Sequence, residues 1–290
     1  MSHMNTPALP RILTIAGTDP TGGAGVQADI KSIQAAGGFS YSVVTSLVAQ
    51  NTTGVQEIFT PPIDFLRAQL RSITDDVAID AIKIGMLGTT EIIEVVREFL
   101  TTHARDCKVV LDPVMVASSS DRLLTREAEE ALRELASLAD VITPNLPELA
   151  VLAGVDPAEN FDAAIAQAQG LAHTLGTTVI VKGGHLTGER ADNAVVTADS
   201  VHHVPVTRVE TKNTHGTGCS FSSALATRLG AGFDTPAATE WASRWLHEAI
   251  AHADALAVGH GRGPVDHGHV GRRMQRAADC NPEHLSLIHI

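Results

Sequence analysis

The sequence predicts an α/β protein with a doubly wound, mostly parallel central sheet that is flanked by helices. Short apolar segments alternate with longer amphipathic ones along the 290 residues, as strand–helix–strand units require. The short segments are apolar throughout, which is typical of strands that helices cover on both faces. Polar side chains and glycines repeatedly follow these segments. Ligands of such sheets bind beyond the carboxyl ends of the strands, so this placement indicates one shared site.

The individual elements follow from local patterns. Strands are predicted for six short apolar runs, at residues 11–16, 41–48, 81–84, 108–111, 141–143 and 179–182. Helices are predicted where apolar residues recur at intervals of three or four, from Val26, over 91–100 and 125–138, and from Phe221. Residues 192–206 have the pattern of a polar-edged hairpin, which predicts a small antiparallel addition at one edge of the sheet.

The composition excludes several classes of function. The formal net charge is −12 and aromatic residues make up only 3%, so a basic or base-stacking surface for nucleic acid is not expected. The three cysteines, Cys107, Cys219 and Cys280, are far apart, which indicates neither a disulfide framework nor a zinc finger. No apolar run approaches the roughly 20 residues that a membrane span needs. We expect a soluble, cytoplasmic protein that binds neither nucleic acid nor membranes.

The most informative segment is residues 212–220, Lys-Asn-Thr-His-Gly-Thr-Gly-Cys-Ser, which leads into a helical pattern. Gly216 and Gly218 let the backbone amides converge around Thr217, and a helix N-terminus carries unpaired N–H donors and partial positive charge. The segment is a candidate site for a transferring phosphoryl group; an ordinary glycine-rich turn is the alternative. The helix start is expected to lower the pKa of Cys219, so that its thiolate could take a proton from a substrate hydroxyl. A small buried core residue is the alternative for Cys219.

Other polar side chains near predicted strands are candidates for the same site. Asp112 and Glu148 are carboxylates of the kind that hold Mg²⁺ beside phosphates, although both could simply stand at helix starts. Lys182 could neutralise a phosphate or be solvated. The amide of Gln50 could pair with a ring nitrogen and an amino group of a heterocycle, or with backbone. Asp29 lies within the first predicted helix, where most carboxylates are surface charges.

Together these segments resemble the hydroxymethylpyrimidine/phosphomethylpyrimidine kinase family of the ribokinase superfamily. The resemblance rests on eight segments in order, residues 16–29, 48–52, 83–87, 111–115, 143–148, 181–185, 212–219 and 259–265. It implies a ribokinase-like kinase domain over residues 11–270. Residues 1–10 are then an N-terminal tail or tag remnant, and residues 271–290 are a C-terminal tail or remnant.

This resemblance implies an activity and its partners. Such enzymes use ATP and Mg²⁺ to phosphorylate 4-amino-5-hydroxymethyl-2-methylpyrimidine, and then its monophosphate to the diphosphate, for thiamin biosynthesis. The resemblance also implies a homodimer. In some relatives the kinase is fused to another module of the same pathway.

The resemblance also implies roles for the candidate residues. Residues 216–219 would form the anion hole, with Cys219 where many sugar kinases of the superfamily carry a catalytic aspartate. Gln50 would bind the aminopyrimidine edge. Gly17, Asp29 and Met86 would line the pyrimidine pocket. Asp112 and Glu148 would bind Mg²⁺, and Lys182 would bind the phosphates.

Two alternatives share most of these features. A pyridoxal-type vitamin kinase of the same superfamily would use the same anion hole with a different ring pocket. A non-catalytic pyrimidine-binding protein would keep the fold, although the intact residues 216–219, Asp112 and Glu148 speak against it. A nicotinamide dehydrogenase is disfavoured, because residues 22–25 lack the Gly-x-Gly-x-x-Gly pattern.

Overall fold

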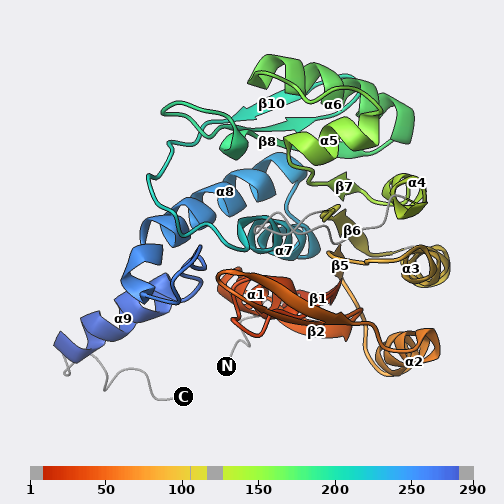
Figure 1. The fold of residues 1–290 in the computed structure, drawn as a ribbon, viewed down its shortest axis with the longest axis horizontal. Coiled ribbons are helices and arrows are strands. Elements are labelled where there is room, and N and C mark those ends of the chain that lie inside the picture. The colour runs from red at the N-terminus through yellow and green to blue at the C-terminus, as the bar shows by residue number, and fades with distance from the viewer. Residues whose placement is uncertain (1–8, 105, 116–126, 281–290) are drawn as a thin grey trace, which may run out of the picture.

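The structure is a computed structural model that describes residues 9–104, 106–115 and 127–280. Within these residues a central sheet of eight strands lies between two layers of helices (Figure 1). The strand order is β10-β9-β8-β7-β6-β5-β1-β2. The strands are β1 (Arg11–Ala16), β2 (Phe39–Val44), β5 (Ala81–Ile84), β6 (Lys108–Leu111), β7 (Val141–Ile142), β8 (Thr178–Lys182), β9 (Asn193–Val196) and β10 (Val201–Val204).

The six neighbouring strands β2, β1, β5, β6, β7 and β8 pair in parallel. The strand β9 pairs antiparallel with both β8 and β10. The predicted doubly wound sheet and its antiparallel edge addition are therefore confirmed. The parallel strands bring their carboxyl ends to one edge of the sheet. The loops that follow β1, β5, β6, β7 and β8 meet there.

Helices cover both faces of the sheet (Figure 1). One face packs against α1 (Gly25–Ala35), α7 (Thr217–Gly230) and α8 (Thr235–Ala251). The other packs against α2 (Ile63–Thr74), α3 (Thr90–His103), α4 (Glu127–Ala136), α5 (Leu146–Ala153) and α6 (Phe161–Leu175). Alternate residues of a strand enter opposite cores: Ile12 packs with the α1–α7 layer, and Leu13 with the α2–α3 layer. This two-sided burial explains why the central strands are mostly apolar, with Thr14 of β1 and Lys83 of β5 as buried polar exceptions.

The predicted strand 41–48 is wrong in its extent. The strand β2 ends at Val44, and β3 (Leu47–Asn51) pairs with β4 (Gly54–Phe59) in a separate two-stranded sheet. Two hydrogen bonds turn the chain between β2 and β3: Thr45 Oγ1 donates to the Met86 carbonyl at 2.8 Å, and the Thr18 amide donates to the Ser46 carbonyl at 2.9 Å. Gln50 therefore lies on a hairpin beside the main sheet and not at the end of one of its strands.

Several helices are present that the sequence analysis did not assign. They are α2, α6, α8 and α9 (His269–Cys280). Helix α9 occupies residues assigned to a tail, and its first residue is buried, with the His269 ring stacked on that of His252. The predicted helix at 125–138 appears as α4, and its expected start at Thr125 lies outside the described residues.

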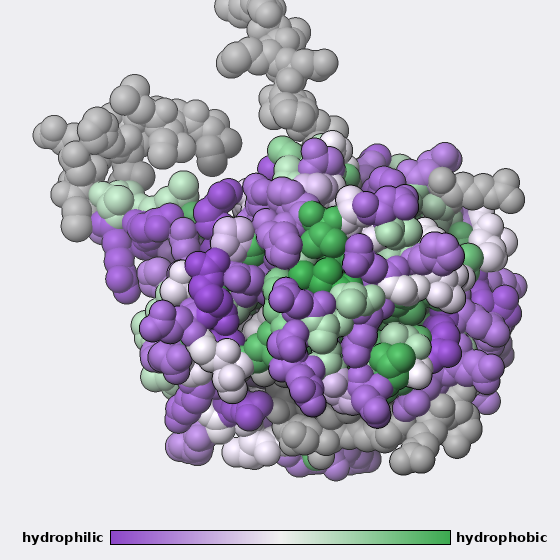
Figure 2. Space-filling model, turned by 90° about the horizontal axis from the view of Figure 1, so that it is seen from above, coloured by the Kyte–Doolittle hydropathy of each residue, from purple (hydrophilic) through white to green (hydrophobic). Residues whose placement is uncertain are grey.

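The surface above α6 and β10 is mostly hydrophilic, with a few hydrophobic side chains gathered near its middle (Figure 2). None of the helices in the described part of the chain combines the length and the apolar character that a membrane crossing requires.

Candidate active site

The predicted helix start after the glycine-rich loop is confirmed, because α7 begins at Thr217 directly after Gly216. Gly216 has φ = 76°, the left-handed conformation that glycine adopts without strain. The amides of Gly218 and Cys219 lie in the first helical turn, where N–H groups have no acceptor within the helix. Among the described residues no hydrogen-bond acceptor is found for the amides of Gly218 and Cys219, so the first turn of α7 presents two donors at the carboxyl edge of the sheet.

Two predicted residues lie directly beside this turn. A Cβ atom placed on Gly218 would lie 3.3 Å from Asp112 Oδ2 and 3.8 Å from Lys182 Nζ. Lys182 Nζ lies 3.5 Å from Asp112 Oδ1, which also accepts a 2.9 Å hydrogen bond from Thr143 Oγ1. The ends of β6 and β8 thus bring a carboxylate and an ammonium to the helix start, and glycine at 218 leaves the space between them open.

Glu148 lies at the first turn of α5 and forms a capping box with Asn145. The Asn145 amide donates to Glu148 Oε2 at 2.8 Å, and the Glu148 amide donates to Asn145 Oδ1 at 2.9 Å. Burial raises the pKa of Glu148 to about 7, the charge of Asp112 adds to this, and Lys182 opposes it. The interpretation of Glu148 as a residue of the helix start is confirmed, and its side chain also shares the electrostatic environment of Asp112 and Lys182.

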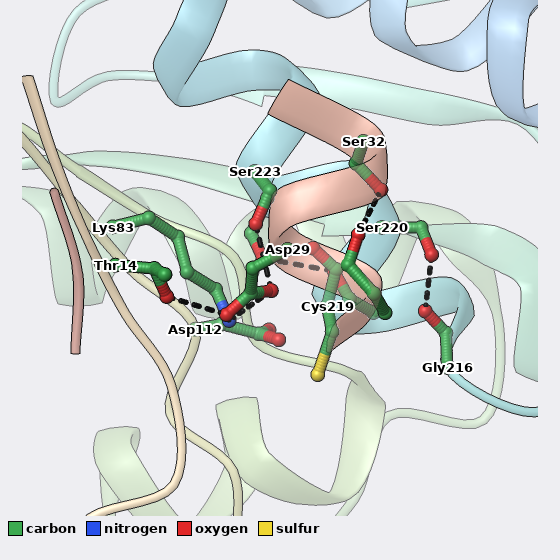
Figure 3. A network of polar contacts seen from close by, with 12 residues as sticks. Thr14, Asp29, Ser32, Lys83, Asp112, Gly216, Cys219, Ser220 and Ser223 are labelled. Carbon is green, nitrogen blue, oxygen red and sulfur yellow. Dashed lines mark hydrogen bonds and ion pairs between the residues drawn. The ribbon is translucent and has the colours of Figure 1, made fainter. Parts of the chain in front are cut away.

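The expected lowering of the Cys219 pKa is wrong. Burial raises the pKa of Cys219 to about 11, and the carboxylates of Asp29 and Asp112 also raise it, while Lys83 lowers it. The half-buried thiol stands in the first turn of α7, near the buried polar residues drawn in Figure 3. Desolvation and the two nearby carboxylates together outweigh the favourable charge of Lys83.

Two of the predicted pyrimidine-pocket residues touch each other. A Cβ on Gly17 would lie 2.9 Å from Met86 Cε, so the thioether packs against the backbone at the end of β1.

Gln50 lies on β3 and is half-buried, and within the described residues its side-chain amide makes no hydrogen bond. The tip of this hairpin is fixed, because Thr52 receives hydrogen bonds from the amides of Gly261 and Arg262 at 3.1 Å each.

The prediction that Asp29 lines the pyrimidine pocket is wrong, because its side chain is fully buried and enclosed by protein. Lys83 Nζ lies 2.9 Å from Asp29 Oδ1 and 3.0 Å from Oδ2 (Figure 3). Ser223 Oγ and Thr14 Oγ1 donate to the two oxygens at 2.7 and 2.5 Å. All of the acceptor positions of the carboxylate are engaged.

Lys83 is a partner in this network that was not predicted from the sequence. A signal was present, because Lys83 interrupts an otherwise apolar strand, and a buried lysine needs a carboxylate partner. The partner could not be identified from sequence, since Asp29 is 54 residues away.

A second missed contact joins the two glycine-rich loops. His215 Nε2 donates to Asp19 Oδ2 at 2.7 Å, and the amides of Gly23 and Ala24 donate to the same oxygen at 3.2 and 2.8 Å. Burial alone would raise the pKa of Asp19, but hydrogen bonds from His215 and Thr21 outweigh it and lower the pKa to about 2. The loop after β1 and the loop before α7 are therefore held together as one unit.

The comparisons with known proteins agree with this arrangement. The phosphomethylpyrimidine kinase family model matches residues 19–266. The chain is 45% identical over 264 residues to the hydroxymethylpyrimidine/phosphomethylpyrimidine kinase of Escherichia coli, covering 89% of this chain and 97% of that kinase. It is 63% identical over 282 residues to the thiamine biosynthesis multifunctional protein ThiED of Corynebacterium efficiens, covering 97% of this chain and 38% of that protein. The chain thus spans about two fifths of the multifunctional relative.

Solved structures show the same fold. The ADP complex of Bacillus subtilis pyridoxal kinase superposes with a TM-score of 0.82 at 36% identity, covering 90% of this chain and 98% of that one. The phosphomethylpyrimidine kinase of Clostridium difficile superposes with a TM-score of 0.73 at 34% identity, covering 83% and 99%. The fold is therefore ribokinase-like, and the match over residues 19–266 means that this chain belongs to the phosphomethylpyrimidine kinase family.

Proposed function

We propose that the protein uses ATP to phosphorylate 4-amino-5-hydroxymethyl-2-methylpyrimidine and then the resulting monophosphate. The observation that carries the proposal is the approach of Asp112 and Lys182 to the first turn of α7, in a chain of this family. Phosphoryl transfer depends mainly on positioning and on stabilising negative charge. An ammonium and unpaired helix amides at one point supply that stabilisation.

In the proposed mechanism the amides of Gly218 and Cys219 bind the oxygens of the transferring phosphoryl group, where charge builds up in the transition state. Lys182 neutralises the phosphates from the opposite side. In the first step the thiolate form of Cys219, a minor species near neutral pH because the pKa is about 11, accepts the proton of the attacking hydroxyl and becomes the thiol. The second step attacks with a phosphate oxygen that is already ionised near neutral pH, so it needs no base.

The residues present fit Mg²⁺. This ion is usually bound through one or two carboxylates together with substrate phosphates and waters, and not by an all-protein cage. Asp112 and Glu148 supply two carboxylates; burial is the main cause of the raised pKa of Glu148, and the charge of Asp112 adds to it. In the described part of the chain no cluster of three or more His, Cys, Asp or Glu residues offers a closed site. When bound, Mg²⁺ would neutralise phosphate charge beside these two carboxylates.

The proposed function is tested by mass-spectrometric product analysis after incubation with hydroxymethylpyrimidine and Mg-ATP. Formation of the monophosphate followed by the diphosphate is expected. Unreacted pyrimidine, with ATP intact, would contradict the proposal.

A second candidate function is phosphorylation of pyridoxal. It is favoured by the superposition on pyridoxal kinases from Bacillus subtilis and Staphylococcus aureus at TM-scores of 0.82 and 0.81. Both functions would use the same helix start, and the ring pocket would decide between them. A direct comparison of kcat/KM for pyridoxal and for hydroxymethylpyrimidine separates the two.

Replacing Gln50 with leucine should weaken pyrimidine binding at least tenfold while leaving ATP binding unchanged. Leucine keeps approximately the volume but removes the amide, and each polar group of the ring left unpaired costs about 1–3 kcal/mol. Isothermal titration with each ligand separately measures the effect. The matched control is Gln56→Leu on the neighbouring strand β4, where the side chain is exposed. Equal pyrimidine affinities for Q50L and the wild type would contradict the assignment.

Replacing Glu148 with glutamine should raise the Mg²⁺ concentration needed for half-maximal activity, because a neutral amide is a poorer ligand for a hard cation. Glutamine can still accept the Asn145 amide, so the capping box should survive. Activity is measured against Mg²⁺ concentration, with the exposed Glu159→Gln as control. Superimposable curves for E148Q and the wild type would leave Glu148 as a capping residue only.

The same variant should change the pH dependence of stability. The folded protein keeps a proton on Glu148 up to about pH 7, whereas the ordinary pKa is 4.5. The folded state thus holds more protons than the unfolded chain between these values, and stability falls as pH rises through them. E148Q should lose less thermal stability over this range than the wild type.

We also propose a homodimer in the cytoplasm, where ATP is available. Apolar side chains are exposed on β2, the edge strand of the sheet, and on the segments that follow it: Phe39, Leu47, Ile58, Phe59 and Phe65. Contiguous exposed apolar groups are typical of an association surface, and these five side chains lie on the edge strand and the segments that directly follow it. Sedimentation equilibrium distinguishes a dimer from a monomer.

A further inference from the structure

Lys83 is a fully buried lysine in the centre of the sheet, and the proposed mechanism does not use it. Its ammonium lies against both oxygens of Asp29, at 2.9 and 3.0 Å. Thr14 on β1 and Ser223 on α7 bind the same carboxylate (Figure 3). The pair therefore joins four elements, namely β1, α1, β5 and α7.

The ammonium lies toward the carboxyl end of β5. A Cβ atom placed on Gly85, the residue after this strand, would lie 2.7 Å from Lys83 Nζ. The neighbouring parallel strand β6 is in register, with Ile84 opposite Leu111, so Asp112 follows at the same level of the sheet. The positive charge thus lies beneath the edge at which the candidate active site is assembled.

The same network fixes the first turns of α7. Ser223 follows Cys219 by four residues, so the two side chains project from the same face of the helix. The 2.7 Å hydrogen bond from Ser223 Oγ to Asp29 Oδ1 holds this face against the ion pair. Helix α7 cannot move relative to Lys83 without breaking this contact.

The orientation of the Lys83–Asp29 pair matters, because the electrostatic potentials of its two charges cancel at any point that is equally distant from both. At Cys219 the effect of Lys83, which lowers the thiol pKa, exceeds the opposing effect of Asp29. Lys83 in turn stays charged: burial alone would lower the lysine pKa, but Asp29, together with the charges of Cys219 and Asp112, outweighs burial and raises it. At Cys219, in the first turn of α7, the pair therefore acts as a net positive charge.

We propose that Lys83 is a positioning residue of the phosphoryl-transfer site, a fixed positive charge held by Asp29 that stabilises negative charge developing at the first turn of α7. This inference rests on the proposed function. Lys83 touches no substrate in this role. It acts through the field at Cys219 and Asp112, which is strong in a low-dielectric interior and requires no reorganisation during the reaction.

The test removes both charges together, since removing one would leave an unpaired buried charge. Lys83→Met with Asp29→Asn approximately preserves both volumes, and asparagine can still accept the Ser223 hydroxyl. We expect kcat for the first phosphorylation to fall about tenfold or more, with KM for the pyrimidine within about twofold of the wild type. A second neutral pair, Lys83→Gln with Asp29→Asn, is measured in parallel in case one combination does not fold.

A second readout does not require kinase activity. The neutral pairs lose the larger effect of Lys83 together with the smaller opposing effect of Asp29, so the Cys219 thiolate becomes less favoured. Alkylation of Cys219 by iodoacetamide at a fixed pH of about 8 should therefore be slower than in the wild type, as followed by peptide mapping. Cys107 is the internal control, because it lies before β6 at the opposite end of the sheet, with its thiol directed to the Ile79 carbonyl.

The matched control variant is Arg11→Met with Asp80→Asn. This ion pair joins the beginnings of the same two strands, β1 and β5, at the end remote from the site, with a distance of 2.7 Å. It should lower thermal stability without changing kcat or Cys219 alkylation. If the neutral Lys83 and Asp29 pairs fold and retain both wild-type kcat and wild-type alkylation, the pair is structural only and the proposal is overturned. An inactive wild type that still shows slower alkylation in these variants would refute the proposed function and support the charge effect.

Discussion

Gly216→Ala is expected to remove nearly all phosphorylation activity, lowering kcat at least about 100-fold. A Cβ on Gly216 would lie 1.7 Å from the Gly23 carbonyl oxygen, a distance that forces the two glycine-rich loops apart. The residue also has φ = 76°, which costs alanine about 1–2 kcal/mol. Because the first-turn amides of α7 follow directly, they move with the loop, and a displacement of about 1 Å at a reacting site can cost 100-fold.

The control for Gly216→Ala is Gly232→Ala, two residues beyond the other end of α7. Gly232 has φ = 88°, and a Cβ there would meet nothing within 4 Å. The two variants share the backbone strain, and only G216A adds the collision. Initial rates and thermal unfolding are measured for both: G232A should unfold a few degrees earlier with unchanged kcat. Normal kcat in G216A would show that the position of this loop is irrelevant to transfer.

Cys219→Ser is expected to slow the first phosphorylation at least about 100-fold and the second much less. A positioned general base typically contributes about 10²–10⁴-fold, and a serine hydroxyl stays protonated near neutral pH. The raised pKa of Cys219, about 11, adds a second expectation. Below this value the thiolate fraction rises tenfold per pH unit, so wild-type kcat for the alcohol should increase from pH 7 to pH 10. The variant should lack this increase.

The measurement follows each step separately, with the alcohol or the monophosphate as starting material, across the same pH range. Equal losses in the two steps would mean that Cys219 shapes the anion site and is not a base. A wild-type profile that is flat with pH would also contradict the base role. The backbone amides remain in C219S, so ATP affinity should be unchanged and serves as the control.

Much of the fold could be predicted because the relevant signals are local. A strand covered on both faces is mostly apolar, and β1, β5 and β6 show this apart from Arg11 and Lys108 at their first positions and the buried Thr14 and Lys83. The end of β2 was misplaced for the opposite reason. The residues after Val44 continue to favour a strand, and only contacts with Met86 and Thr18, distant in sequence, turn the chain into the separate β3–β4 hairpin.

Part of the candidate active site could also be predicted from the sequence. Asp112 and Lys182 follow parallel strands, which bring them to one edge of the sheet, and the helix start at Thr217 follows from the glycines before it. Asp29 was misassigned because the residues next to a carboxylate in a helix do not show whether its side chain is buried or which groups it contacts. Its partners Lys83 and Ser223 lie 54 and 194 residues away.

The sequence by itself therefore determined the alternating strands and helices, the glycines at the start of α7, and the kinds of functional group that reach the carboxyl edge of the sheet. Tertiary structure alone decided that Asp29 is enclosed by Lys83, that Gly216 packs on the Gly23 carbonyl, and that the Cys219 thiol has a raised pKa. The physical reason is the distance along the chain between the residues that interact. Burial patterns and backbone freedom depend on neighbouring residues, whereas the protonation and accessibility of a buried group depend on charges and surfaces that only folding brings together.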